Sequence, residues 1–435
     1  MTILRVAEVD SEVRRRPASS LRSNFKWTFS GNVVYAVCQW GMLSVLAKQG
    51  SAGTVGQFAL GLAIAAPVFM FANLQLRAVQ ATDTRREYRF SGYFTLRVLT
   101  TTLGLLAIAG IMPLLHYDSV TRIVVLLVAL AKSIECVSDV IGGLLQLHER
   151  LDQVARSLMI RGSLSLLFFG ATFLWTHSLI ACTSAMCVAW LAVLIGYDFR
   201  CARAALLPGE LYVEFDWRVA RRLIVLSLPL GLVMTLISLN TNIPRYLLQR
   251  FCGTAELGIF ASLAYLMVAL NLVVNALCQS ATTRLSCLFS ERQFNDYCRL
   301  LFRLSSFGAV VVLAGVPLSL LCGRTLLTIL YRSQYGNYAN VLAILVAASG
   351  ISATAFFLTS GLNAARCFCT QLPIFAASTL TAVLGCLILI PRCGLNGAAI
   401  ALLLSATAGL AGNLLVLNAT LRSARTRAEV CDGSY

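Results

Sequence analysis

Three ionisable side chains, Lys132, Glu135 and Asp139, lie within one long apolar stretch of the chain. Offsets of three and four residues place them on one face of a helix. An ionisable group inside a membrane costs at least about 2.5 kcal/mol, so this face is expected to line a cavity or meet a partner. The cluster could move a proton or cation or contact a polar substrate, or it could be a structural ion pair. This face has two carboxylates and one amine, so one carboxylate is expected to have no cationic partner.

Amide side chains recur at helical spacing elsewhere in the chain. Asn271, Asn275 and Gln279 follow one another at intervals of four, so they share one helix face. Such amides can bond sugar hydroxyls in a polar channel wall, or they can tie neighbouring helices together. Asn73 and Arg77 share a face in the same way. Arg77 could bind a lipid phosphate through its fork-shaped guanidinium, or it could anchor the helix end at the membrane surface.

The run Asn240-Thr241-Asn242-Ile243-Pro244-Arg245 gathers polar groups at the end of another apolar stretch. Pro244 is expected to break the helix there, because proline lacks an N–H and clashes with the preceding turn. Arg245 would then lie on the outer side, where it could bind a diphosphate or an acidic sugar, or contact a lipid headgroup. The candidate residues of a substrate or ion cavity are Asn73, Arg77, Lys132, Glu135, Asp139, Asn240, Asn242, Arg245, Asn271, Asn275 and Gln279.

The composition decides which class of protein must position these groups. The chain has 435 residues, of which 58% are hydrophobic and 12% charged, and its mean hydropathy is +0.77. Soluble proteins are about 25% charged. Several apolar stretches exceed the ~20 residues that cross a bilayer as a helix. The sequence therefore predicts an all-α polytopic membrane protein rather than a cytosolic enzyme.

Reading apolar runs against charged or Gly/Pro-rich breaks predicts twelve membrane-spanning helices, each bounded to within about four residues. They lie near 27–48, 54–78, 93–115, 120–147, 155–176, 178–199, 222–243, 256–282, 300–322, 338–361, 371–391 and 395–420. The polar stretch 200–221 divides them six and six. We therefore expect a cytoplasmic N-terminal segment (1–26), an N-lobe (27–203), a cytoplasmic linker (204–221), a C-lobe (222–421) and a cytoplasmic tail (422–435).

The distribution of basic residues predicts the orientation of these helices. With the N-terminus inside, 26 of the 35 Lys and Arg residues fall on the cytoplasmic side and 7 on the outer side. Cytoplasmic segments retain an excess of Lys and Arg. Both termini are therefore expected to be cytoplasmic.

A short internal repeat relates the two predicted halves. Val55-Gly56-Gln57-Phe58-Ala59 opens the second span, and Leu257-Gly258-Ile259-Phe260-Ala261 opens the eighth. An even number of spans in each half means that both halves enter the membrane from the same side. The halves would then be related by an axis along the membrane normal, as in transporters whose substrate path lies between two lobes.

Other function classes find little support in the residues. The net charge of +16 is clustered between apolar stretches, whereas a nucleic-acid binder would carry it along one exposed face. The 15 Cys and 3 His residues show no metal-ligand spacing, so no metal site is expected. There is no Gly-x-x-x-x-Gly-Lys-Ser/Thr loop for ATP. No extramembrane stretch is long enough for a catalytic domain, so we expect no enzyme.

Several segments resemble a known family. The segment NVVYAVCQWGMLSVLAKQGSAGTVGQFALGLAIAAPVFMFANLQLRAVQATD, Asn32 to Asp83, resembles the start of bacterial polysaccharide-biosynthesis membrane proteins of the Wzx-type O-antigen flippase group. The stretch from Leu228 to Leu285, with LNTNIPRYLL, ELGIFASLAYL and NALCQSATTRL, is similar to their second lobe. The late segment GLNGAAIA also fits.

This resemblance implies the two-lobed fold of the multidrug/oligosaccharidyl-lipid/polysaccharide exporter superfamily, a MATE-like fold that works by alternating access. The implied activity is to flip an undecaprenyl-diphosphate-linked oligosaccharide from the cytoplasmic to the outer leaflet of the bacterial inner membrane. No cofactor is implied, although H⁺ or Na⁺ could drive transport. The implied partners are that lipid-linked oligosaccharide, membrane lipids, a polysaccharide polymerase and other assembly proteins, without nucleic acid. By position the implied cavity residues are Arg77, Lys132, Glu135, Asp139, Arg245 and Asn275.

Alternatives remain open at this point. A cation-coupled multidrug antiporter of the same superfamily would need an acidic cavity for cationic drugs. A flippase of a peptidoglycan or teichoic-acid precursor would use nearly the same site. A polymerase or ligase of lipid-linked glycans would be favoured by large outer loops with acids or His, and the predicted outer connections are short.

Overall fold

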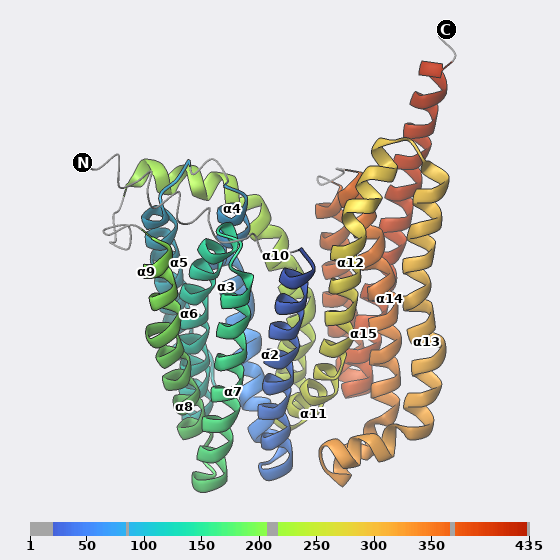
Figure 1. Ribbon diagram of the computed structural model, residues 1–435. Helices are drawn as coiled ribbons and strands as arrows, with labels where there is room; N and C mark the ends of the chain where they lie inside the picture. The colour runs from blue at the N-terminus through green and yellow to red at the C-terminus, as the bar shows by residue number, and fades with distance from the viewer. Residues whose placement is uncertain (1–20, 84–86, 207–215, 366–369, 433–435) are drawn as a thin grey trace, which may run out of the picture.

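The computed structural model describes residues 21–83, 87–206, 216–365 and 370–432, and within these ranges the chain forms helices and no strands. Two helical bundles lie side by side (Figure 1). The first, here the N-lobe, contains α2 (Leu21–Gln49), α3 (Ala52–Asn73), α4 (Leu76–Thr82), α5 (Phe90–Ile111), η1 (Met112–Leu114), α6 (Ser119–Leu147), α7 (Leu151–Thr176), α8 (Leu179–Val193), the π-helix η2 (Leu194–Asp198) and α9 (Phe199–Ala205).

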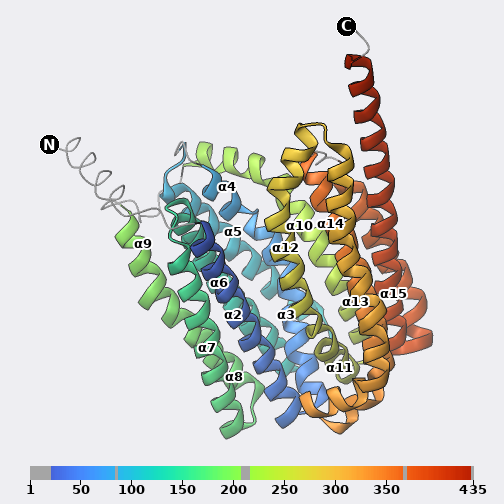
Figure 2. The same ribbon diagram turned by 45° about the vertical axis from the view of Figure 1, so that its right-hand side comes forward.

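The second bundle, here the C-lobe, continues from the long helix α10. Its elements are α10 (Trp217–Cys252), α11 (Thr254–Tyr265), α12 (Met267–Ser290), α13 (Phe294–Leu330), η3 (Ser333–Tyr338), α14 (Ala339–Ala364) and α15 (Gln371–Asp432). Helix α2 begins and α15 ends at the same end of the molecule, which we call the termini end (Figures 1 and 2). The opposite end is called the distal end. Under the predicted orientation, the distal end is the outer one.

The chain is a multi-pass membrane protein by the length and apolarity of its helices. Among the described residues, nine helices are long and apolar enough to span a membrane, or ten if the bent α10 counts as one span. The charged residues in α6 keep that 29-residue helix out of this set. Helix α15 is two helices joined at Gly394, whose backbone is not helical. Counting α6 and both halves of α15 would give twelve spans, and that number stays a prediction.

Helix α10 differs from the expectation for its segment. It begins at Trp217, inside the predicted linker, and it continues through Pro244 to Cys252, so the predicted break at Pro244 is wrong. In membrane helices, polar side chains and neighbouring helices satisfy the backbone groups that a proline frees.

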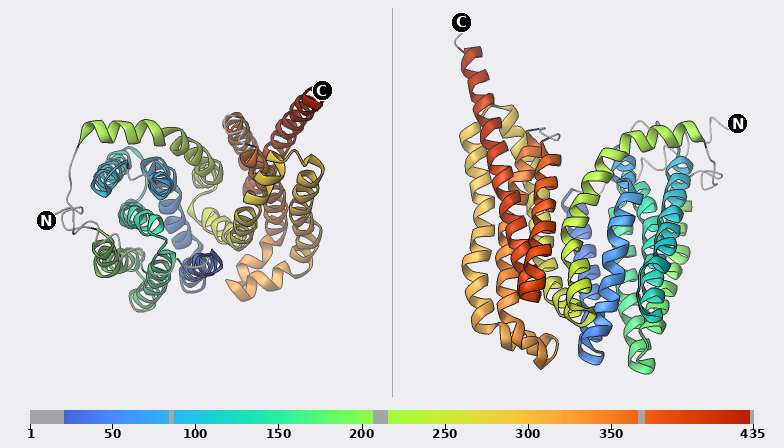
Figure 3. Two further views of the ribbon diagram at one scale, coloured as in Figure 1. Left: turned by 45° about the horizontal axis from the view of Figure 1, so that its top comes forward. Right: turned by 180° about the vertical axis from the view of Figure 1, so that it is seen from behind.

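The start of α10 lies across the termini end of the N-lobe rather than along the bundle (Figure 3). Helix α10 bends by 51° between its segments 217–228 and 231–252. At the bend, Gly231 lies close to Leu74, so that a Cβ on Gly231 would come within 3.3 Å of the Leu74 Cα. Leu74 is itself in the break between α3 and α4, where it and Gln75 have positive φ angles of 47° and 52°. Two helix discontinuities, one from each lobe, therefore pack on each other.

Other helices are longer than their apolar runs. Helix α13 begins six residues before the predicted span at 300 and ends eight after 322, and α15 continues to Asp432 instead of ending near 420. An apolar run marks the length inside hydrocarbon, whereas a helix ends only where capping or a breaking residue ends its hydrogen bonds. Residues 1–20 and 207–215 of the predicted N-terminal segment and linker lie outside the described residues.

Candidate functional site

A pocket of about 450 Å³ lies in the C-lobe between α10, α11, α12, α14 and α15. Pockets of this size hold small ligands or the headgroup of a larger one. Four of the residues proposed from the sequence line it, namely Asn240, Arg245, Asn271 and Asn275. Most of the remaining lining is apolar, and it includes no Asp or Glu. Arg245 is therefore the charge that defines this pocket.

Arg245 has no carboxylate partner among the described residues. Its Nη1 donates to the side-chain oxygen of Asn242 at 3.0 Å, and its Nε is buried without a hydrogen-bond partner. None of the ion pairs in the described part of the chain includes it. A partly buried cation without a counter-ion loses hydration without gaining an ion pair, and an anion in the pocket would supply that pair. Because α10 passes through Pro244, Arg245 lies within a lobe instead of in an outer loop as expected.

The amides around this pocket have two different roles. Asn240 donates to Ser378 at 3.3 Å and accepts from Ser405 at 3.0 Å, so it ties α10 to both halves of α15. Asn275 donates to the backbone carbonyl of Asn271 at 2.9 Å, which leaves both side-chain oxygens on the exposed wall of α12. These two oxygens can accept hydrogen bonds from hydroxyl groups of a ligand. The side chain of Gln279 lies outside the described residues.

Lys132 and Glu135 pair with each other on α6, and a tyrosine joins them. The ammonium group of Lys132 lies 2.6 Å from Glu135 Oε2, and the phenol of Tyr35 on α2 donates to Glu135 Oε1 at 2.9 Å. Lys132 also lies over the ring of Trp190, 5.7 Å from its centroid. The ion pair is thus within one helix, whereas Tyr35 links α6 to α2 and the cation–π contact of Lys132 links α6 to α8.

Asp139, one turn farther along α6, belongs to a separate cluster. Arg77 Nη1 lies 3.1 Å from one carboxylate oxygen and Arg97 Nη2 3.3 Å from the other. Arg97 is fully buried and also donates to Asn73, while Arg77 reaches Gln146 at 3.2 Å. The expectation of a carboxylate without a cation on α6 is therefore wrong, because two guanidinium groups from other helices share Asp139.

A third charged cluster was missed by the sequence reading. Arg161 on α7 and Asp198 at the end of η2 are both buried and pair at 3.1 Å. Ser138 and Ser157 donate to the same carboxylate. Both charged residues lie near the ends of predicted spans. In the sequence, a buried ion pair at such positions looks the same as a cytoplasmic anchor and an unrelated acid in a loop. The π-helical turn, which is frequent at functional sites, aims Asp198 inward.

Tyr265 lies near charged residues of both lobes. It ends α11, and its phenol interacts electrostatically with Arg245 of the C-lobe and with Glu135 of the N-lobe. Glu135 interacts in turn with Arg161. Arg245 and Glu135, from different lobes, thus both lie within electrostatic range of Tyr265. No sequence pattern marked Tyr265, because a lone tyrosine in an apolar stretch is ordinary.

The first comparison with known proteins concerns families. Residues 21–283 match the family described as "Polysaccharide biosynthesis protein", which is more than half of the chain. The chain belongs to the polysaccharide biosynthesis protein family. Among its relatives is the capsular polysaccharide biosynthesis protein CapF of Staphylococcus aureus. The two are 27% identical over 389 residues, which is 88% of this chain and 95% of the relative.

Solved structures share the fold of this family member. The lipid II flippase MurJ in an inward closed conformation superposes with a TM-score of 0.69 at 11% identity, covering 92% of this chain and 90% of that one. A MOP superfamily transporter from Pyrococcus furiosus, whose binding pocket is described as reversed in polarity, gives 0.60 at 13% identity over 92% and 95%. A MATE structure in complex with MaD3S gives a TM-score of 0.60 at 11% identity over 92% of this chain and 95% of that one, and the MATE-like fold predicted from the sequence is confirmed.

Proposed function

We propose that this chain flips an undecaprenyl-diphosphate-linked oligosaccharide, a repeat unit of a surface polysaccharide, from the cytoplasmic to the outer leaflet of the bacterial inner membrane. Arg245, a partly buried cation whose Nε is enclosed and which has no carboxylate partner among the described residues, carries this proposal, because the described lining of the pocket contains no other charged side chain. Such a group is suited to an anionic headgroup, and a guanidinium matches phosphate oxygens in geometry. The family and the relative CapF, both named for polysaccharide biosynthesis, support the sugar part.

The same pocket argues against a transporter of cationic drugs. A drug cation would need a carboxylate in the pocket, and the lining contains Arg245 instead. In the described N-lobe, Glu135, Asp139 and Asp198 already have cationic partners. Bringing a further cation near Arg245 would add repulsion in a medium of low dielectric constant. A peptidoglycan or teichoic-acid precursor carries the same anionic lipid chemistry. These substrates are therefore distinguished by identifying the lipid-linked glycan that accumulates when the protein is absent.

Deletion of the coding sequence tests the proposal directly. Loss of a flippase leaves a finished, lipid-linked repeat unit on the inner leaflet, because synthesis continues and transfer stops. We therefore expect complete undecaprenyl-diphosphate oligosaccharide to accumulate, measured by mass spectrometry of the lipid extract, while surface polysaccharide disappears. Accumulation of unfinished units would indicate an enzyme, and accumulation of lipid II would indicate the peptidoglycan precursor.

The role of Arg245 has a matched control in the same helix. Arg245→Ala removes the pocket cation and should impair export strongly, whereas Arg250→Ala removes an exposed arginine in the last turn of α10 and should not. Export is measured as surface polysaccharide per unit of membrane-inserted protein. Equal and mild effects of both substitutions would contradict a substrate-binding role for Arg245.

A further inference from the structure

The two copies of the internal repeat touch each other through their glycines. Gly56 opens α3 and Gly258 opens α11, and the two helices cross there backbone to backbone. A Cβ on Gly56 would overlap the backbone of Thr254 and Gly258, and one on Gly258 would overlap the backbone of Ala52. Only residues without a Cβ allow this approach. Positions that are equivalent in the two halves therefore form a single contact between the lobes.

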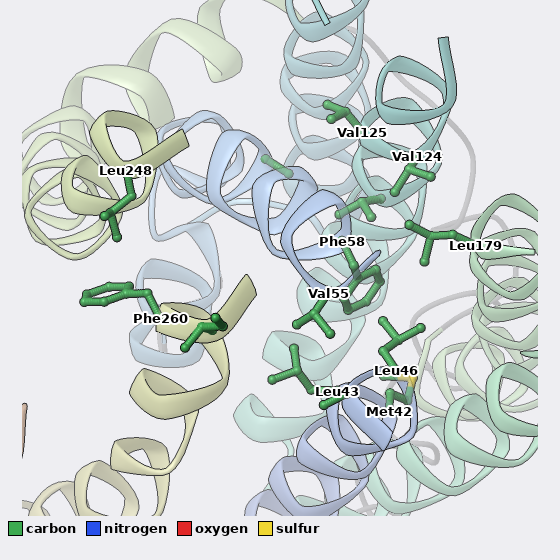
Figure 4. Close-up of a cluster of buried hydrophobic side chains, with 14 of the residues drawn as sticks. Met42, Leu43, Leu46, Val55, Phe58, Val124, Val125, Leu179, Leu248 and Phe260 are labelled. Carbon is green, nitrogen blue, oxygen red and sulfur yellow. The ribbon is translucent and has the colours of Figure 1, made fainter. Parts of the chain in front are cut away.

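Apolar residues of both repeats surround this crossing. Val55 and Phe58 of α3 and Phe260 of α11 are buried in one cluster, together with Leu248 of α10. Figure 4 shows the side chains of Val55, Phe58 and Phe260 drawn around the crossing helices, with Leu43 of α2 beside them. Burial of these side chains excludes water from the boundary between the lobes at this level.

Three hydrogen bonds join the lobes in the same, distal half of the molecule. Trp40 Nε1 donates to the Tyr331 hydroxyl at 3.1 Å, and Arg332 Nε donates to the carbonyl of Lys48 at 2.8 Å. The hydroxyl of Tyr246 donates to the backbone carbonyl of Ala63. Toward the termini end, the ribbons of the N-lobe and of α12–α15 draw apart (Figure 1). Helix α10 packs on the N-lobe at the termini end as well, but the contact of the N-lobe with α11 and with the segment around Tyr331 lies in the distal half.

We propose that the Gly56–Gly258 crossing is the outer gate of the transporter, closed in this structure and opened when the lobes rock to release substrate. Two helix ends that meet without side chains can separate as rigid bodies, because no interdigitated side chains at the crossing have to be withdrawn. The apolar cluster and the three hydrogen bonds give the closed state its stability. This inference rests on the proposed function for its direction of transport, but the gate itself is a property of the lobes.

The first test introduces a Cβ where the gate has no room. Gly56→Val and Gly258→Val should prevent closure, because the overlapping atoms are backbone atoms that cannot rotate away. Closure is measured by photo-cross-linking from Lys48→benzoylphenylalanine to the segment around Arg332, identified by mass spectrometry. We expect the yield to fall about tenfold, which corresponds to ~1.4 kcal/mol against the closed state.

Gly110→Val is the matched control, since a Cβ at Gly110, near the distal end of α5, has nothing within 4 Å. This substitution should leave the cross-link unchanged. If a valine variant does not reach the membrane, the alanine variant at the same glycine adds one carbon atom and should still lower the yield. An unchanged yield in every membrane-inserted Gly56 and Gly258 variant would overturn the proposal.

The second test distinguishes a gate from a permanent contact. Lys48→Cys and Arg332→Cys, joined by a short bismaleimide, would lock the distal end closed in the full chain. A gate has to open in every cycle, so export should stop in the joined double variant and continue in each single variant treated in the same way. Full export from the joined protein would show that the crossing is static and would overturn the proposal.

The two tests also separate the gate from the proposed substrate. The cross-linking yield needs no substrate, so a fall in yield supports the gate even if the accumulating lipid proves to be a different one. Conversely, accumulation of finished oligosaccharide in the deletion strain together with unchanged cross-linking would support the flippase and contradict this gate.

Discussion

At the scale of single residues, Asp139 is the carboxylate that pairs with two guanidinium groups in the described N-lobe. Its carboxylate is shared by Arg77 and by the fully buried Arg97, which come from two different elements. Removing one partner of a fully buried ion pair costs ~3–5 kcal/mol, and the partial exposure of Asp139 reduces that figure. The cluster therefore holds α4, α5 and α6 together.

This arrangement predicts different outcomes for Asp139 of α6 and Asp152 of α7. Asp139→Asn leaves two guanidinium groups without a counter-ion and should lower both the amount of protein in the membrane and its thermal midpoint in detergent. Asp152→Asn, in an exposed pair with Arg156, should change neither. A thermal midpoint for Asp139→Asn equal to that of Asp152→Asn would contradict the structural role.

Glu135→Gln tests ion coupling instead. Glu135 pairs within its own helix and bonds Tyr35, so the glutamine variant should remain folded and in the membrane. If Glu135 couples H⁺ or Na⁺ movement to flipping, export from this variant is lost although the protein is present in normal amount. Normal export, measured as surface polysaccharide, would rule out coupling through Glu135.

Which of these residue roles could be read from the sequence depends on where the partners lie. Helical spacing placed Lys132 and Glu135 on one face, because both partners belong to one helix. The partners of Asp139 come from α4 and α5, and Arg245 has no carboxylate partner among the described residues. Only tertiary structure shows this. Pairing across 40 or 60 residues leaves no local pattern.

At the scale of elements, Gly394 decides how α15 is divided. Its φ of 53° and ψ of −127° lie in a region that residues with a Cβ rarely adopt. This backbone lets the two halves of α15 turn back on each other at the distal end, close to the predicted boundary between two spans. The turn was predictable from the sequence, because Pro391, Arg392 and Gly394 interrupt an apolar run.

Gly394→Ala is therefore expected to destabilise the protein by about 1–3 kcal/mol, since alanine at this backbone conformation is strained. Gly170→Ala, in the middle of α7 with open space around the position, should instead be neutral or stabilising by up to about 1 kcal/mol. Thermal midpoints in detergent compare the two variants. An equal response at both glycines would contradict the strained turn.

The lengths of other elements could not be read from hydropathy. The Pro244 position shows why, because a proline that was expected to end the helix lies inside α10, as prolines can in membrane helices. The start of α10 lies along the termini end of the N-lobe. In this part of α10, polar and apolar residues alternate at the spacing of the helical turns. A rule that seeks apolar runs places that segment in a linker.

At the scale of the whole molecule, the repeat in the sequence predicted two halves related along the membrane normal. The structure adds that the repeated glycines meet. Sequence comparison of the halves can identify equivalent positions, but it contains no information on whether those positions touch. The distribution of Lys and Arg supplies the orientation, which remains a prediction.

Fusion proteins test that orientation. Alkaline phosphatase fused after Tyr435 should be inactive and green fluorescent protein there should fluoresce, because a cytoplasmic C-terminus exposes both to the reducing compartment. Alkaline phosphatase fused after Cys393, at the distal turn of α15, should be active. The opposite pattern would place the gate on the cytoplasmic side.

Transport by the purified chain is the central claim of this account. Proteoliposomes that contain the protein and undecaprenyl-diphosphate oligosaccharide can be treated with a glycosidase that cannot cross the bilayer. The account predicts that wild-type protein and the Arg250→Ala variant bring the inner-leaflet glycan within reach of the enzyme, whereas the Arg245→Ala variant leaves it protected. Glycan that stays protected with the folded wild-type protein, with H⁺ and Na⁺ gradients supplied in turn, would contradict the account.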